Sequence, residues 1–487
     1  MDTTNYVGCG SQTTLLANAH AAFKHLPKQI VELGHVFTDA GFELALVGGP
    51  VRDAFLAKTP HDFDLTTNAR PDDTQELLRQ WGANTWAVGK AFGTIGGQKA
   101  GLTVEVTTYR TEEYDSSSRK PTVQYGDHLE GDLSRRDFTI NACAMLLPQL
   151  RLVDPHGGLE DLAEGVLKTP VSAQQSFDDD PLRIMRAARF TAQLGIDVSE
   201  DVMAAMSAQA PRLQIVSAER VQAELHRLMI SPYPRRGLEL MVYTGVCDEV
   251  LPEFSALRDT VDEHNRHKDV FEHTLTVLDN AMSMETDETG PVPAPDFILR
   301  FAAIMHDVGK PDTRKFEPDG TVSFHHHEVV GAKLTRARMR ALKFDKATTK
   351  AVTKLVRLHL RFHGYGEQGW TDSAVRRYVA DAGDLLQRLH RLTRADCTTR
   401  NRRKANYLRA AYDDLEARID QLAKQEKLDA VRPDLNGDQI MSILGLEPGP
   451  QVGQAYQFLL KRRMEEGPLG QERAEEELVQ WWKTHNK

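Results

Sequence analysis

Hydrophobic and polar residues follow two different patterns along the chain, and the change between them lies near residue 157. Before that point an amphipathic run, LPKQIVELGHVFTDAG (26–41), is followed by the short apolar run Leu44–Val47, which predicts a helix and then a buried strand. Short β-like runs such as FDLTT and LTVEVTTYR continue to about residue 155 and are separated by turn residues. The first part of the chain is therefore expected to fold as a head of mixed helices and strands.

Helical periodicity dominates from residue 157 onward, in runs such as DDPLRIMRAARFTAQLG, SAERVQAELHRLMI and FILRFAAIMHDVG. The C-terminal run DLNGDQIMSILGLEPGPQVGQAYQFLLKRRMEEG predicts a helical hairpin around its Gly-Pro turn. Within the head, the polar stretch 112–132 (EEYDSSSRKPTVQYGDHLEGD) predicts a mobile loop. The pattern indicates an α+β protein in which a long helical body follows an α/β head.

Length and composition narrow the class of protein. At 487 residues the chain exceeds one hydrophobic core, and a prior of about 150 residues per domain predicts roughly three domains. No apolar run approaches the ~20 residues that a membrane span needs, so no membrane partner is expected. The four cysteines (Cys9, Cys143, Cys247 and Cys397) are scattered without a CxxC pair, which favours a reducing, cytoplasmic location over a thiolate zinc site.

The formal net charge of −10 has the opposite sign to that expected of a nucleic-acid-binding surface. Net charge is a mean, however, and nucleic acid responds to local patches. Basic residues gather at 333–346, 388–394 and 400–409, although such runs are also typical of solvated helix faces. Charge alone therefore decides neither for nor against a nucleic-acid partner.

The segment LVGGPVRDAFLAKTPHDFDLTT carries the first candidate chemistry. The strand at Leu44–Val47 runs into Gly48-Gly49, and Pro50 suits the first position of a helix. Glycines let the backbone approach a triphosphate, and Arg52 in the first helical turn can add a charge-assisted contact to phosphate. A Gly-Gly turn taken alone is also compatible with a purely structural turn.

The sequence Asp62-Phe63-Asp64 follows shortly afterwards and changes that balance. Residues two apart on a strand face the same side, so the two carboxylates point together while Phe63 points into the core. Like charges held together repel, and Mg²⁺ ions, which prefer carboxylate and phosphate oxygens, would relieve that repulsion. Glu105 in the run VEV is a third candidate carboxylate from a neighbouring strand.

Together these motifs resemble the signature of the class II nucleotidyltransferases, the family of tRNA CCA-adding enzymes and bacterial poly(A) polymerases within the polymerase-β superfamily. The resemblance continues through LSRRDFTINACAM (133–145), DDPLRIMRAARFTAQLG (179–195) and SAERVQAEL (217–225). It implies roles for residues of three kinds. Those expected to hold metal are Asp62 and Asp64; those expected to line the triphosphate are Gly48, Gly49 and Arg52; and those expected to contact the ribose or base are Arg136, Asp137, Asp180, Arg183 and Arg186.

The DDPLR segment has a physical reading that fits addition without a template strand. Asp180 is expected at the N-cap and Pro181 at the first position of a helix, with Asp180 and Arg183 on one face. A carboxylate accepts from the exocyclic amine of C or A, and a guanidinium donates to the adjacent ring nitrogen. U and G present a carbonyl instead, which would leave the carboxylate unpaired. The plainer alternative is that Asp180 caps the helix and Arg183 pairs with an acidic neighbour; the family resemblance favours base reading.

A second candidate metal site lies in the helical body. The His306-Asp307 doublet, with more distant His and Asp partners, resembles the HD metal-dependent phosphohydrolases. The resemblance implies six ligands: His273, His306, Asp307, His327, His359 and Asp396. Mixed imidazole and carboxylate ligands suit a transition metal such as Ni²⁺, Mn²⁺ or Co²⁺. His325 and His326 adjoin His327, which leaves the ligand there open, and the domain could also serve only as an RNA-binding scaffold.

The resulting hypothesis has four regions: a polymerase-β-like nucleotidyltransferase head with a mixed sheet (17–155), a helical neck (156–255), an HD domain (256–410) and a helical C-terminal region (411–487). The expected activity is transfer of CMP and AMP from CTP and ATP onto the 3′ end of tRNA with Mg²⁺. The motifs do not separate this from a poly(A) polymerase or from an enzyme that adds only A or only CC. An alternative of another class is an HD phosphohydrolase whose head only binds RNA. The sequence is silent on oligomeric state.

Overall fold

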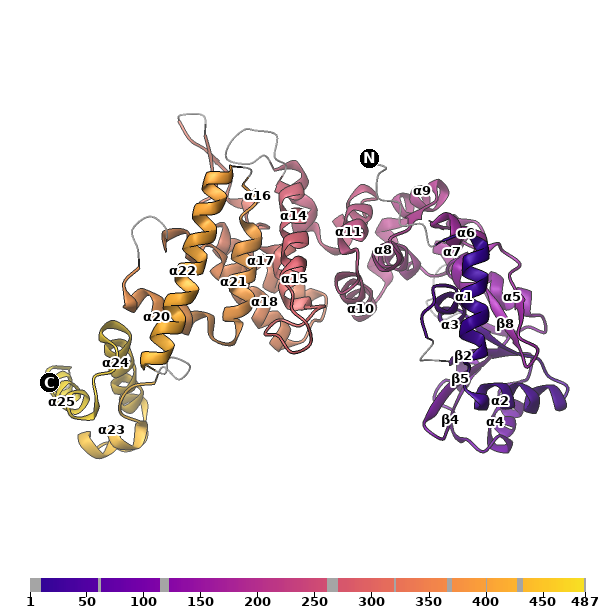
Figure 1. Ribbon diagram of the computed structural model, residues 1–487, viewed down its shortest axis with the longest axis horizontal. Coiled ribbons are helices and arrows are strands. Elements are labelled where there is room, and N and C mark those ends of the chain that lie inside the picture. Colours follow the sequence, from indigo (N-terminus) through magenta and orange to yellow (C-terminus); the bar gives the residue numbers. More distant parts are fainter. Residues whose placement is uncertain are drawn as a thin grey trace. The chain divides into compact units, whose positions relative to one another are not determined.

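The computed structural model describes residues 10–59, 63–113, 122–260, 270–318, 321–365, 370–399, 401–426 and 432–485. The chain forms two compact units, Met1–Pro252 and Glu253–Lys487, and each is described by itself. Figure 1 follows the element order from the N-terminal helices to the C-terminal ones. The expected α+β class, with a mixed sheet followed by a helical body, is confirmed.

The head contains most of the strands. Its helices are α1 (Gln12–Lys24), α2 (Lys28–Asp39), α3 (Gly49–Phe55), α4 (Pro71–Gln80), α5 (Leu129–Ser134), α6 (Gly158–Glu164) and the short 3-10 helices η1 (Lys90–Phe92) and η2 (Thr139–Asn141). Its strands are β1 (Leu44–Val47), β2 (Phe63–Thr67), β3 (Asn84–Trp86), β4 (Thr94–Lys99), β5 (Leu102–Thr108), β6 (Arg110–Glu113), β7 (Thr122–Tyr125), β8 (Ala144–Leu147) and β9 (Arg151–Val153).

Within the described residues one seven-stranded sheet has the order β3-β4-β5-β2-β1-β8-β9. The pair β2–β5 is parallel and the other neighbours are antiparallel, so the sheet is mixed as predicted. Helices α2 and α4 pack on one face, where Phe63, Leu65, Val104 and Val106 are buried. Because side chains alternate along a strand, the residues between these four point to the opposite face.

The opposite face is divided into a covered part and an open part. Over β1 and β8 a core of Ala45, Val47, Ala144 and Leu146 packs against Leu129 and Leu133 of α5. Over β2 and β5 the side chains of Asp64 and Glu105 are exposed. The open part of the sheet therefore carries carboxylates, whereas the covered part is apolar.

The predicted loop at 112–132 is partly wrong. Strands β6 and β7 pair as an antiparallel hairpin that includes Arg110 opposite Tyr125, and α5 begins at Leu129. The intervening residues 114–121 lie outside the described part of the chain. Backbone pairing between two four-residue strands satisfies the polar main chain here, which composition alone does not reveal.

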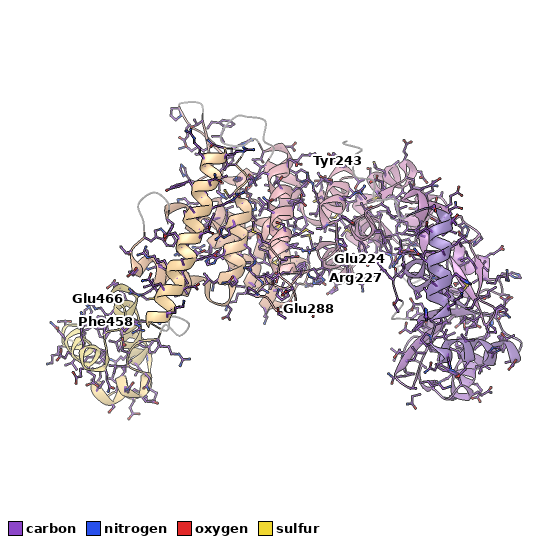
Figure 2. All side chains as sticks on the ribbon, in the orientation of Figure 1. Glu224, Arg227, Tyr243, Glu288, Phe458 and Glu466 are labelled. Carbon is purple, nitrogen blue, oxygen red and sulfur yellow. The ribbon has the colours of Figure 1, made fainter. Side chains whose placement is uncertain are left out.

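The neck completes the first unit. Its elements are β10 (Val166–Leu167), α7 (Ala173–Asp179), α8 (Leu182–Leu194), β11 (Asp197–Val198), α9 (Glu200–Gln209), η3 (Ala210–Ile215), α10 (Ala218–Met229), α11 (Pro234–Tyr243) and α12 (Val246–Val250). Helix α8 is the centre, since α10 and α11 both pack on it and most of its side chains are buried. Figure 2 labels Glu224 and Arg227 of α10 and Tyr243 at the end of α11.

The second unit is almost entirely helical. Its main elements are α14 (Val270–Ser283), α15 (Phe297–Met305), α16 (Lys310–Thr313), β12 (Lys315–Phe316), β13 (Val322–Ser323), α17 (His327–Ala341), α18 (Lys346–Leu358), η5 (His359–Gly364), α20 (Asp372–Ala382), α21 (Leu386–Asp396), α22 (Arg402–Glu426), α23 (Gly437–Leu444), α24 (Pro450–Glu466) and α25 (Gln471–His485). Helix α15 is apolar on nearly every side and is buried, since α14, α18 and α21 all pack against it.

The predicted C-terminal hairpin is confirmed as α23 and α24, and α25 follows it. The three helices share a small core in which Leu459 and Leu478 are buried, and Phe458 (labelled in Figure 2) stacks on Trp481 with ring centroids 4.8 Å apart. In the described residues there is no helix that is both long and apolar enough to cross a membrane.

Candidate nucleotide and metal sites

The Gly48-Gly49 turn joins β1 to α3 as the sequence predicts. Gly48 caps the helix with φ 72° and ψ −130°, a conformation that side-chain-bearing residues rarely adopt. A Cβ atom at Gly48 would lie 3.2 Å from Nη1 of Arg136. The guanidinium of Arg136 therefore lies next to the backbone of this turn. The sequence predicts that Arg136 contacts the nucleotide and that the turn holds its phosphates.

Arg52 is buried in a hydrogen-bond network behind this turn. Its Nη1 donates to Oδ1 of Asn141 at 2.8 Å, and Nδ2 of Asn141 donates to Oδ1 of Asp137 at 3.1 Å. Nε of Arg186, from α8, donates to Oδ2 of Asp137 at 2.7 Å. The network ties the head helix α3 to the neck helix α8 through residues that the sequence assigned to one nucleotide site.

The charge of Asp137 is stabilised by this network. Burial by itself raises the pKa of the carboxyl, but the Arg186 guanidinium, the hydrogen bond from Asn141 and the charge of Arg183 outweigh it and lower the pKa to about 2. Asp137 is therefore an ionised, fixed anchor at the head–neck junction. Asn141 was not identified from the sequence.

The carboxylates Asp64 and Glu105 are directly paired in register across the parallel strands β2 and β5. Both side chains are exposed and lie on the open face of the sheet. Asp62, predicted to lie beside Asp64, falls outside the described residues. Carboxylate oxygens are the ligands that divalent cations such as Mg²⁺ prefer. The two exposed carboxylates on adjacent strands therefore fit the expected metal.

A buried acid lies beside these carboxylates, on the same face of the sheet. Oδ2 of Asp132, on α5, accepts from Oγ1 of Thr66 at 3.2 Å and from Nη2 of Arg136 at 3.1 Å, while Oδ1 accepts from Nη2 of Arg135 at 2.7 Å. Burial raises the pKa of Asp132, but Arg136 and Arg135 outweigh it and hold the pKa below its ordinary value. Sequence reasoning missed Asp132, although its spacing to two arginines at three and four residues on a helix is a usable signal.

The base-reading candidates Asp180 and Arg183 are held by other partners in this structure. Helix α8 begins at Leu182 with Pro181 in the capping position, one residue later than predicted. Oδ1 of Asp180 nevertheless accepts from the backbone N–H of Leu182 at 3.0 Å, as a helix-capping side chain does. Its Oδ2 accepts from Nη2 of Arg220, on α10, at 2.9 Å.

Arg183 is buried and bonds in the other direction. Its Nη1 donates to Oγ of Ser176 at 2.9 Å, and its Nη2 donates to the backbone carbonyl of Arg135. The guanidinium is thus fixed between α7 and the head segment that carries Arg136. Arg220, which the sequence did not single out, is the basic partner that Asp180 has here.

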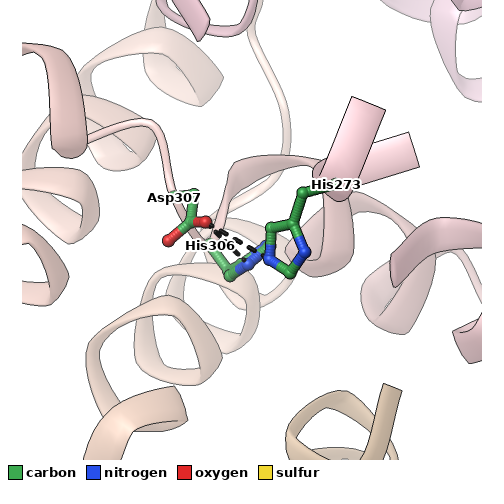
Figure 3. Close-up of side chains that lie close together, drawn as sticks. All are labelled: His273, His306 and Asp307. Carbon is green, nitrogen blue, oxygen red and sulfur yellow. Dashed lines mark ion pairs between the residues drawn. The ribbon is translucent and has the colours of Figure 1, made fainter. Parts of the chain in front are cut away.

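The HD residues converge from five helices in the second unit. His273 lies on α14, His306-Asp307 at the end of α15, His327 at the start of α17, His359 at the end of α18 and Asp396 at the end of α21. His273, His306 and Asp307 form one group with ligand atoms within 4.8 Å of one another, and Asp307, His327 and His359 form a second. Figure 3 shows the first group, in which Nε2 of His306 lies 3.2 Å and Nε2 of His273 3.6 Å from Oδ2 of Asp307.

Asp396 closes the cluster on the side of His273. Its Oδ1 lies 3.0 Å from Nε2 of His273 and 3.6 Å from Nε2 of His306. Nζ of Lys310 lies 2.8 Å from Oδ2 of Asp307, a contact that the sequence did not predict. His325 and His326 are exposed, so of the three consecutive histidines it is His327 that reaches the cluster.

The imidazole tautomers are set by the backbone. Nδ1 of His306, His327 and His359 each lies 2.7–2.8 Å from a carbonyl oxygen three residues earlier in the chain. Since carbonyls only accept, each Nδ1 carries a proton, which leaves Nε2 as the ring nitrogen that faces the cluster and can bind a metal ion. Among the described residues these three buried Nε2 atoms have no hydrogen-bond partner.

The electrostatics of the cluster favour a bound cation. Burial lowers the pKa of His306, but the carboxylates of Asp307 and Asp396 outweigh it and raise the pKa to about 10. His359 behaves oppositely, since burial and the neighbouring His306 lower its pKa to about 3. Lone pairs and carboxylates that face one another repel, and a positive charge between them, whether a proton or a metal ion, removes that repulsion. The donor set therefore fits a divalent metal.

A glycine-turn cradle beside carboxylates on a mixed sheet, followed by a helical neck and a His-Asp cluster, defines a template-independent nucleotidyltransferase with an HD domain. Models of three families match in that order: the poly A polymerase head domain over 44–168, the probable RNA and SrmB-binding site of polymerase A over 195–257, and the HD domain over 270–423. The chain belongs to the class II tRNA nucleotidyltransferase family.

Similar proteins match the chain over different parts of its length. The A-adding tRNA nucleotidyltransferase of Deinococcus radiodurans is 34% identical over 445 residues, 90% of this chain and 95% of that one. The CCA-adding enzyme of Streptococcus sanguinis is 40% identical over 220 residues, 45% of this chain and 54% of that one. In fold, the chain is similar to the Bacillus stearothermophilus CCA-adding enzyme in complex with CTP, with a TM-score of 0.65, 22% identity, and coverage of 94% and 98% of the two chains.

Proposed function

We propose that this chain adds CMP and AMP from CTP and ATP to the 3′ end of tRNA, completing a CCA end and releasing pyrophosphate. The observation that carries the proposal is the registered pair of exposed carboxylates, Asp64 and Glu105, next to the Gly48-Gly49 turn in a chain of this family. The scattered cysteines and a tRNA substrate are consistent with a cytoplasmic location.

In the proposed reaction the head holds both reactants in line. Asp62 and Asp64, with Glu105 beside them, would hold Mg²⁺, which when bound lowers the charge barrier to attack by the RNA 3′-hydroxyl. Gly48 and Gly49 let the backbone approach the leaving phosphates. Arg52 and Arg136 contribute positive charge along that side, where negative charge accumulates on the departing pyrophosphate.

Selection of the base is assigned to the neck. Asp180 accepts from the exocyclic amine of C or A, and Arg183 donates to the ring nitrogen. Asp137 and Arg186 contact the same nucleotide at the junction of head and neck. Both oxygens of the Asp180 carboxylate already accept hydrogen bonds, from Arg220 and from the backbone of Leu182, so the amine of the incoming base competes with these contacts. U and G leave the carboxylate facing a carbonyl, an unsatisfied pairing that costs about 1–3 kcal/mol.

The proposal is tested with three tRNA substrates: one that lacks CCA, one that ends in C and one that ends in CC. Each is incubated with CTP alone, ATP alone and both, and product lengths are resolved on a sequencing gel. Three added nucleotides that require both triphosphates support CCA addition. Extension only of tRNA already ending in CC, and only with ATP, would make this chain an A-adding enzyme, and a long ladder with ATP would make it a poly(A) polymerase.

We also propose a second activity, metal-dependent phosphohydrolysis at the HD cluster. The observation in its favour is the set of buried Nε2 atoms of His306, His327 and His359 that face carboxylates. These residues with His273, Asp307 and Asp396 would hold Ni²⁺, Mn²⁺ or Co²⁺, and the bound metal would lower the pKa of an attacking water. Release of phosphate from 2′,3′-cyclic or terminal phosphates after loading with each metal supports it; no hydrolysis with any of the three reduces the cluster to a scaffold.

A further inference from the structure

Trp86 is an exposed aromatic side chain in line with the carboxylates of the head. It ends strand β3 and is paired with Gly96 of β4, which in turn is paired with Glu105 of β5, which is paired with Asp64 of β2. Residues paired directly across neighbouring strands present their side chains on the same face. Trp86 therefore belongs to the open face, in the same row as Glu105 and Asp64, and 37% of its surface is exposed.

Gly96 allows the indole to lie flat on the sheet. A Cβ atom at Gly96 would lie 2.1 Å from Cε2 and from Nε1 of Trp86, so any side chain there would displace the ring. Gly96 itself is buried, although it lies on the open face next to the exposed Glu105. The ring thus covers β4 and extends over it toward Glu105.

The ring lies on the side of the carboxylates from which the attacking hydroxyl is expected to approach. In phosphoryl transfer the attacking and leaving oxygens lie roughly in line across the transferred phosphorus. The leaving pyrophosphate is assigned to the turn after β1, which is the neighbour of β2 on one side. The attacking 3′-hydroxyl then approaches from the other side of β2, where β5, β4 and β3 follow in that order.

We infer that Trp86 is the stacking platform for the terminal base of the acceptor RNA, an inference that rests on the proposed nucleotidyl transfer. Single-stranded RNA ends are commonly held by stacking on aromatic side chains, and stacking tolerates any base because every base has a π-face. That tolerance suits an acceptor whose terminal base is not the same at every step of the addition. The incoming base is read by hydrogen bonds in the neck, whereas the acceptor base is held without being read.

The kinetic test separates acceptor binding from triphosphate binding. Trp86→Ala should raise KM for tRNA about tenfold, since one stacked base contributes ~1–3 kcal/mol, while KM for CTP and ATP stays unchanged. Trp86→Phe should retain most of the affinity. Gly96→Ala, which displaces the ring without removing it, should raise KM for tRNA as Trp86→Ala does. Phe316→Ala removes an aromatic that is 71% exposed on β12 of the second unit and should leave KM for tRNA unchanged.

A binding measurement without turnover completes the test. Titration of tRNA into the wild-type protein without nucleotides should quench tryptophan fluorescence, and the quenching should be lost or strongly reduced in Trp86→Phe. An unchanged KM for tRNA in Trp86→Ala, or quenching that is as strong in Trp86→Phe as in the wild type, would refute the platform. A rise in KM for CTP instead would assign the ring to the incoming nucleotide. A wild-type protein that binds tRNA with this quenching but adds no nucleotide would refute the proposed function while leaving the platform standing.

Discussion

At the scale of single residues, Asp64 is the most direct test of the head. It is exposed and lies opposite Glu105, so replacing it removes the proposed metal ligand without opening a cavity in the core. Asp64→Asn should lower the rate of nucleotide addition by more than about 100-fold, because a bound cation contributes several kcal/mol of charge stabilisation. Single-turnover addition to tRNA measures the rate, and the thermal unfolding temperature should not change.

The matched control for this change is Asp73→Asn, an exposed acid on α4, which packs on the opposite face of the sheet. Its addition rate should stay within about twofold of wild type. Addition by Asp64→Asn at the control rate would remove Asp64 from the metal site. Glu105→Gln should fall between the two if Glu105 assists a metal that other carboxylates also hold.

Asp137 provides a pH-dependent prediction. Its pKa of about 2 in the folded protein is below the ordinary value of about 3.9, so its contribution is fully present above pH 4 and is lost as the pH falls from about 4 to 2. The shift corresponds to roughly 2–3 kcal/mol. Asp137→Asn should therefore destabilise the protein by about that amount at pH 6, measured by urea unfolding.

The difference between Asp137→Asn and wild type should shrink as the pH is lowered through 4, because the carboxyl is protonated near pH 4 in the unfolded state but only near pH 2 in the folded state, where Arg186 pairs with it. A difference that stays constant from pH 6 to pH 3 would mean that the carboxylate charge is not what Asp137 contributes.

At the scale of elements, the structure separates what a local pattern reveals from what it does not. The strand at Leu44–Val47, the glycine turn and the C-terminal hairpin were predictable, because each depends on a contiguous pattern or on turn-forming residues. The hairpin of β6 and β7 was missed, since its strands are four residues long, partly polar and stabilised mainly by pairing with each other.

The candidate sites divide in the same way. The residue types that carry chemistry were visible in the sequence, including the carboxylates of the head and the histidines of the HD cluster. Their partners were not, since Asn141 reaches Arg52 across 89 positions and Arg220 reaches Asp180 across 40. Strand register, which aligns Trp86 with Glu105, is also set by long-range pairing.

The approach of α16 to α17 provides an element-level prediction. A Cβ atom at Gly309 would lie 2.2 Å from the carbonyl oxygen of His327 and 2.6 Å from the backbone nitrogen of Gly331. Gly309→Ala should therefore separate the two helices, move His327 from the cluster and destabilise the protein by ~1–3 kcal/mol. Thermal unfolding and metal content by mass spectrometry report the two effects.

The control is Gly453→Ala in α24, where an added Cβ meets no atom within 4 Å. That change should be neutral or stabilise by up to about 1 kcal/mol, because alanine favours the helix more than glycine does. Equal behaviour of the two alanine variants would contradict the close approach of α16 and α17.

At the scale of the whole molecule, the nucleotidyltransferase site and the HD cluster belong to separate units, Met1–Pro252 and Glu253–Lys487. Asp307→Ala should therefore abolish metal retention and any hydrolysis by the HD cluster while leaving nucleotide addition within about threefold of wild type. Asp64→Asn should have the converse effects. Loss of nucleotide addition in a folded Asp307→Ala protein would show that the cluster is needed for the transfer reaction.

The basic run at 388–394 is neutralised by acidic partners from elsewhere in the second unit. The basic run at 388–394 does not form an isolated patch, because Arg388 binds Asp296, and Arg394 binds Asp413 and Glu416. These pairs explain how a basic run is accommodated in a chain of net charge −10. They also favour the interpretation of this run as a structural helix face over that of an RNA-binding patch.

The carbonyl anchors of the HD histidines have a consequence for how the cluster tolerates sequence change. His306, His327 and His359 are each oriented by the main chain of the residue three positions earlier, not by a side chain. Substitution of those preceding residues leaves the orienting oxygen in place. Most mutational drift around the cluster therefore cannot rotate the rings, and a relative that keeps only the histidines and aspartates inherits their alignment as well.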